Sequence, residues 1–129
     1  MISSRPYLLR AIYDWIVDSG LTPYILVDAE AEDVTVPVQY IQDGRIILNV
    51  SPEAVRGLEV GNDWVMFSAR FGGVSMNVSF PPRTALAIYA KENGRGMVFS
   101  DEDEMGGTPP EPPTDPGPPK GKPSLRVVK

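Results

Sequence analysis

The chain has 129 residues and a net charge of −5, and it contains no cysteine and no histidine. This length fits one domain with a modest core, and the two missing residue types exclude disulfides, the usual zinc ligand sets, and cysteine–histidine or serine–histidine catalysis. Because the acidic balance lacks the positive charge that sequence-independent nucleic-acid binding requires, we expect neither a nucleic-acid partner nor a cofactor.

A helix is predicted near the start of the chain. Ser4 is a candidate capping residue, Pro6 fixes an early helical φ, and Gly20 supplies a stop, so the helix should run to about residue 19. Charged residues at positions 10, 14 and 18 interrupt its apolar sequence. It is therefore predicted to be neither a signal peptide nor a membrane span, and we expect a cytoplasmic protein without membrane contact.

The apolar surface of this helix is wider than one sheet would cover. A helix on a sheet buries about a third of its circumference. Two interpretations fit the excess: the helix is wedged between the sheet and loops, or its second face packs on a symmetry mate. We expect the second, a homodimer, through Tyr7, Leu8, Ala11, Ile12, Trp15 and Ile16.

The remainder up to residue 99 predicts short strands. Asp43-Gly44 and Gly72-Gly73 indicate hairpins, and Pro37 favours an edge or a bulge. About six strands and one leading helix predict a mainly β fold, a small and partly open β-barrel. The strands are expected at residues 24–28, 34–41, 45–50, 64–71, 74–80, 86–91 and 97–99, although 86–91 could be helical by propensity.

No constellation of side chains predicts catalysis, so we do not expect an enzyme. The carboxylates of Glu30, Glu32 and Asp33 fit a solvated loop. Residues 67–71 offer a different feature, because the small Ala69 lies between aromatic residues and next to Arg70. Such a strand suits an extended peptide with an acidic or carboxy-terminal group, although ordinary core and rim residues would give the same pattern.

The composition changes near residue 100. An acidic run at 101–104 and a proline-dense stretch from 109 to 123 predict a disordered linker. An apolar and basic cluster follows at 125–129, which is either an end without a role or a short linear motif for a partner. The expected organisation is a domain at 1–99, a linker at 100–124 and a motif at 125–129.

Five segments in order resemble the stringent starvation protein B (SspB) family, which comprises bacterial specificity adaptors of the ClpXP protease. They are RPYLLRA at 5–11, DGRIILN at 43–49, ARFGG at 69–73, LAIYAKENG at 86–94 and LRVVK at 125–129. The resemblance implies an Sm-like β-barrel that dimerises through its first helix. It also implies protein quality control after ribosome rescue, in which each subunit binds the ssrA degradation tag of stalled nascent chains.

The resemblance further implies two peptide contacts. The tag-binding groove is expected at Phe67, Ser68, Ala69, Arg70, Phe71, Val74, Tyr89, Ala90, Met97 and Phe99. The motif that docks on the amino-terminal domain of ClpX is expected at Leu125, Arg126, Val127, Val128 and Lys129. Any zinc in that partnership would belong to ClpX. The linker here is short and proline-dense. A small-barrel RNA-binding protein is the alternative interpretation, since related barrels share this architecture.

Overall fold

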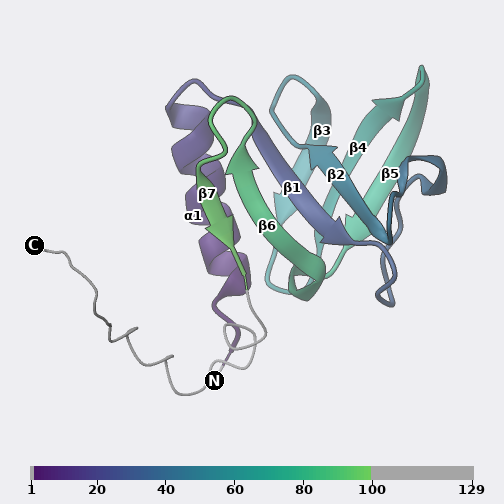
Figure 1. Ribbon diagram of the computed structural model, residues 1–129, viewed down its shortest axis with the longest axis horizontal. Helices are drawn as coiled ribbons and strands as arrows, with labels where there is room; N and C mark the ends of the chain where they lie inside the picture. Colours follow the sequence, from purple (N-terminus) through teal and green to yellow (C-terminus); the bar gives the residue numbers. More distant parts are fainter. Residues whose placement is uncertain (1, 100–129) are drawn as a thin grey trace, which may run out of the picture.

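The computed structural model describes residues 2–99, and the predicted linker and docking motif lie outside them. One helix is followed by seven strands and two short 3-10 helices (Figure 1). In chain order these are α1 (Arg5–Asp18), β1 (Pro23–Asp28), η1 (Val38–Tyr40), β2 (Arg45–Asn49), β3 (Val55–Val60), β4 (Val65–Phe71), β5 (Val74–Phe80), η2 (Pro82–Thr84), β6 (Ala85–Ala90) and β7 (Gly96–Val98).

The strands form two antiparallel sheets, one with the order β2-β1-β6-β7 and one with the order β3-β4-β5. The prediction of a mainly β fold with a leading helix is confirmed. Within residues 2–99 no strand ladder joins the two sheets, so they stay open and do not close into a barrel. In Figure 1 the β7 edge of the four-stranded sheet lies in front of α1, and β4 and β5 stand at the other end of the molecule.

Helix α1 begins and ends where local chemistry dictates, with one correction. Gly20 has a φ of 78°, and the amides of Gly20 and Leu21 donate to the carbonyls of Val17 and Ile16. This is the double hydrogen bond of a glycine-terminated helix. Ser4 stands at the capping position, but its side chain makes no capping bond. Its predicted capping role is wrong, because the hydroxyl of Ser3 instead accepts from the Arg5 amide at 3.1 Å.

One apolar core lies between the two sheets and is covered by α1. Leu9 and Ile16 of the helix join Ile25 and Ile88 of the first sheet and Phe80 of the second in a single buried cluster. Burial of this kind is the main stabilising contribution to a domain of this size. In the part of the chain that the structure describes, no helix is long and apolar enough to cross a bilayer.

Both predicted turns are present, but the turn at Asp43-Gly44 does not join the two strands that were expected on either side of it. Asp43 and Gly44 both have positive φ, 55° and 76°, which is the backbone of a two-residue turn with primed geometry. After this turn β2 pairs with β1. The strand predicted at 34–41 is wrong: only Thr35 forms a bridge, to Ser79, and η1 follows. Pro37 explains this, since it has no amide to donate to a ladder.

Strand β3 was missed by the sequence prediction. Gly57, at a φ of 66°, interrupts it where the register with β4 shifts, between Arg56 and Glu59. Such a bulge bends a strand and redirects its side chains. The segment 86–91, which could have been helical, is strand β6. The Gly72-Gly73 hairpin is confirmed, and β4 and β5 pair from Val65 with Phe80 to Phe71 with Val74.

Candidate functional site

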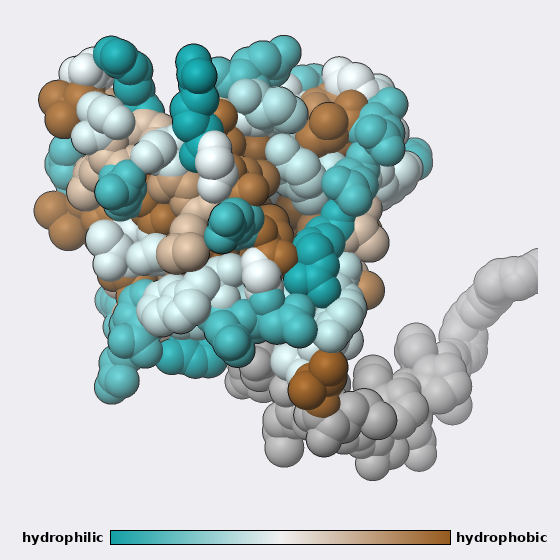
Figure 2. All heavy atoms as spheres, turned by 180° about the vertical axis from the view of Figure 1, so that it is seen from behind, coloured by the Kyte–Doolittle hydropathy of each residue, from teal (hydrophilic) through white to brown (hydrophobic). Residues whose placement is uncertain are grey.

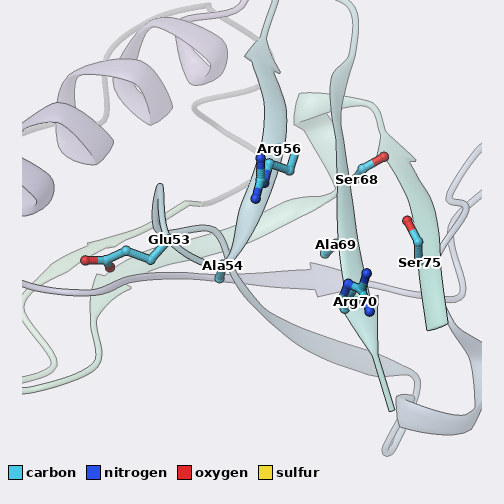
Figure 3. A pocket seen from close by; sticks show the side chains of 7 residues that line it. All are labelled: Glu53, Ala54, Arg56, Ser68, Ala69, Arg70 and Ser75. Atoms are coloured by element: carbon cyan, nitrogen blue, oxygen red, sulfur yellow. The ribbon is translucent and has the colours of Figure 1, made fainter. Parts of the chain in front are cut away.

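A hollow of about 420 Å³ opens beside β4, where β3 stops covering its edge. β3 begins at Val55, opposite Ala69, whereas β4 continues to Phe71. Before Val55 the chain turns away, because the amides of Ala54 and Val55 both donate to the carbonyl of Ser51. Seven residues line the hollow: Glu53, Ala54, Arg56, Ser68, Ala69, Arg70 and Ser75 (Figure 3).

The lining of the hollow combines two guanidinium groups with small side chains. In Figure 3 Arg56 extends from β3 and Arg70 from β4, and the short side chain of Ala69 lies between them in this view. Arg70 donates to the carbonyl of Gly73 at 3.5 Å and is otherwise exposed. Guanidinium groups bind carboxylates well, and an uncovered strand edge suits an extended peptide. The arrangement can therefore hold an extended chain that carries an acceptor group.

Of the predicted groove residues on β4 and β5, only the middle ones reach this hollow. Ser68, Ala69 and Arg70 line it. Phe67 is buried in the core, and Phe71 is half-buried, with its ring centroid 5.6 Å from that of Tyr40. Val74 begins β5 at the hairpin and is 67% exposed, outside the lining of the hollow.

The remaining predicted groove residues belong to the other sheet or follow it. Tyr89 packs edge-on against Tyr24, at 6.0 Å between ring centroids. Ala90 and Phe99 are buried, and Met97 is half-buried on β7. The structure therefore does not bring Tyr89, Ala90, Met97 and Phe99 to the hollow beside β4.

The structure adds lining residues that the sequence analysis missed. Glu53, Ala54 and Arg56 come from the start of β3 and the turn before it, and Ser75 comes from β5. The alternation of apolar and polar residues at 55–60 was the only local signal for β3, and Gly57 interrupts it. Once β3 is recognised, pairing of Arg56 with Ser68 follows from the antiparallel register.

The proposed dimer face of α1 divides by burial. Tyr7, Ala11 and Trp15 are exposed, with 45% of Tyr7 and 50% of Trp15 accessible, and Leu8 and Ile12 are half-buried. Ile16 is only 2% exposed and belongs to the core of its own chain. The helix is thus partly wedged against the sheets, and a second copy would meet the other five residues but not Ile16. Figure 2 shows that, on the side of the molecule opposite to Figure 1, hydrophobic residues reach the surface in patches between hydrophilic ones.

Two described groups with a shifted pKa lie away from the hollow. Hydrogen bonds from the amide and the hydroxyl of Thr22, at 2.9 and 2.7 Å, lower the pKa of Glu92. Burial, assisted by the charge of Asp14, raises the pKa of Tyr13 on α1. Tyr13 packs against the core, whereas Glu92 is exposed and bonded to Thr22, and neither lines the hollow.

Comparison with known proteins places this chain in a family. The family model of stringent starvation protein B matches residues 3–129. The chain belongs to the stringent starvation protein B family. A stringent starvation protein B homolog from Haemophilus influenzae is 54% identical over 99 residues, which cover 77% of this chain and 66% of that relative. The family membership expected from the five matched segments is therefore confirmed.

Proposed function

We propose that this chain is an SspB-type specificity adaptor that binds the ssrA tag beside β4 and delivers tagged proteins to ClpXP in the cytoplasm. The observation that carries the proposal is the hollow lined by Ala69, Arg56 and Arg70, found in a member of the stringent starvation protein B family. No catalytic step is required, because the role of the protein is to hold two partners together.

The hollow supports tag binding by its shape and its donors. Ala69 contributes only a methyl group, so a peptide backbone has room to approach the edge of β4. The hydroxyl of Ser75 and the two guanidinium groups provide hydrogen bonds to the carbonyl and carboxylate oxygens of such a peptide. Main-chain contacts of this kind give affinity, and side-chain pockets give specificity.

Delivery would depend on the segment at residues 125–129, which we propose binds the amino-terminal domain of ClpX. A linker of about 25 residues has a root-mean-square reach of about 25–30 Å. Tethering makes the second encounter intramolecular, at an effective concentration that can reach the millimolar range. A homodimer formed through Tyr7, Ala11 and Trp15 would present two such segments and add avidity without new contacts.

Fluorescence anisotropy with a labelled ssrA peptide and with a labelled ClpX amino-terminal domain tests this division. We expect a variant that lacks residues 125–129 to bind the peptide as the full chain does and to lose ClpX binding. A matched variant that lacks the five linker residues 109–113 should bind both. Loss of peptide binding in the first variant alone, or no peptide binding by any of the three proteins, would contradict the proposal.

A further inference from the structure

A second hollow, also of about 420 Å³, lies on the outer face of the three-stranded sheet. Arg56 and Ser68 line both hollows, so the two meet at these residues. The second hollow has a mixed polar and apolar lining, formed by Arg56, Gly57, Glu59, Met66, Phe67, Ser68, Asn77, Val78 and Ser79. A peptide held in the first hollow, beside Ala69, can therefore continue into the second hollow across the outer face of the sheet.

At the junction one polar residue from each strand stands in register. Arg56 of β3 pairs with Ser68 of β4, which pairs with Asn77 of β5. The hydroxyl of Ser68 donates to Oδ1 of Asn77 at 2.7 Å. The hydroxyl proton of Ser68 and Oδ1 of Asn77 are therefore engaged in one hydrogen bond. The groups left for a ligand are mainly donors, namely the amide NH₂ of Asn77 and the guanidinium of Arg56.

The guanidinium of Arg56 has its hydrogen-bonding capacity available. Within residues 2–99 it makes no hydrogen bond or ion pair. Two carboxylates line the rest of the surface, Glu53 in the first hollow and Glu59 in the second. In Figure 3 the carboxylate of Glu53 points away from Arg56 and Arg70. A single anionic group is thus favoured at the junction and disfavoured beside Glu53 and Glu59. A polyanion such as RNA would extend past the junction and be repelled by these two carboxylates.

We infer that Arg56 selects peptides with an acidic side chain at the position that crosses the junction of the two hollows. The inference rests on the proposed function, since it assigns a specificity residue to the same peptide site. The bulge at Gly57 lies directly beside Arg56 and marks the point where the register with β4 shifts. The carboxylate of the peptide would accept from the guanidinium and from the Asn77 amide, a pair of charge-assisted and neutral hydrogen bonds.

The test is a positional scan of the labelled ssrA peptide by fluorescence anisotropy at low salt. One series places Asp at each successive position, and the matched series places Asn there. For the wild-type chain we expect one position at which Asp binds about three- to tenfold tighter than Asn. In Arg56→Gln that ratio should fall to about one at the same position, and a general loss of affinity that lowers both series equally would not change this reading. Arg45→Gln, which makes the same charge change on β2 outside both hollows, should keep the wild-type ratio.

Each outcome decides a separate point. Equal Asp-to-Asn ratios in the wild-type chain and in Arg56→Gln at every position, with normal tag binding, would overturn the role of Arg56 and leave the adaptor proposal standing. Loss of the ratio in Arg45→Gln as well would overturn it too, because a general charge effect would then explain the preference. If no peptide of either series binds the wild-type chain, both proposals fail.

Discussion

The two sheets of this molecule differ in what lies on their faces. The four-stranded sheet has one face packed beneath α1, and Ile25, Val27 and Ile88 are almost completely buried there. The three-stranded sheet shares the same core through Phe80 and Val78, but its other face is crossed by a polar row and two hollows. Its strand β3 is bulged and stops short of the end of β4.

The difference indicates that stability and recognition depend on separate residues. Apolar contacts in the core, to which the helix and the inner faces of both sheets contribute, determine whether the chain folds. In the proposed function, the uncovered edge and the donors of the second sheet select the peptide. Variants in the first region should therefore change the free energy of unfolding without a specific effect on peptide affinity, and variants in the hollow should do the reverse.

The largest effect is expected from a cavity in the first sheet. Ile88→Ala removes a fully buried side chain and should lower the free energy of unfolding by about 2–5 kcal/mol. Ile47→Ala, on a half-exposed position of the same sheet, should cost about 1 kcal/mol or less. Urea denaturation measures both. Equal losses for the two variants would contradict the assignment of the core to one face.

A smaller loss of stability is expected at the junction of α1 and β6. Arg5 is 2% exposed, and its guanidinium donates to the carbonyls of Arg83 and Ala85 at 2.9 and 3.1 Å and stacks on Phe99. Arg5→Met leaves these carbonyls without their donor and should cost about 2–3 kcal/mol.

The matched control for Arg5 is Arg10→Met. Arg10 donates to the carbonyl of Val60 from a more accessible position, so its loss should cost about 1 kcal/mol or less. Both variants should keep the peptide affinity of the folded protein. A specific loss of tag binding in Arg5→Met would mean that recognition extends into the first region.

Affinity should change most at Ala69. Ala69→Gln fills the hollow between Arg56 and Arg70 and should weaken ssrA-peptide binding at least about tenfold, whereas Ala69→Ser should stay near wild type. Because Ala69 also packs against the core, some loss of stability is expected, and circular dichroism checks that the variant is folded. Unchanged peptide affinity in a folded Ala69→Gln protein would refute the placement of the site.

The smallest effect concerns acid stability at the first sheet. Since hydrogen bonds from Thr22 lower the pKa of Glu92 below its ordinary value of 4.5, its contribution to stability is present above the unfolded-state pKa and is lost as pH falls through the folded value. Thr22→Val removes the hydroxyl donor and should move the pKa back toward 4.5. A carbon-detected NMR titration measures it, and a wild-type pKa at or above 4.5 would contradict the two contacts.

The parts of the fold that sequence predicted are those with local causes. Gly20, Gly44 and Gly72 each take a positive φ that ends the helix or forms a turn, and such positions are readable from residue type alone. The strand predicted at 34–41 failed because Pro37 outweighs the β propensity of its neighbours. Strand β3 was missed because Gly57 breaks its alternation, although partners on β4 hold it in place.

The candidate site was predicted only where its residues are adjacent in sequence. Ser68, Ala69 and Arg70 lie on one strand and were identified together. Glu53 and Arg56 reach the same hollow only through the pairing of β3 with β4, a long-range contact that no local pattern reports. Tyr89 and Phe99 were assigned to the groove by resemblance, but the topology places them with the four-stranded sheet.

The most direct test of the separation between the two sheets is an NMR titration of the ¹⁵N-labelled full chain with unlabelled ssrA peptide. We expect the largest chemical-shift changes at Ala54, Arg56, Ser68, Ala69 and Ser75, and small changes on β1, β2 and β6. Changes centred on Tyr24, Ile47 and Tyr89 would contradict it, because they would place peptide recognition on the four-stranded sheet.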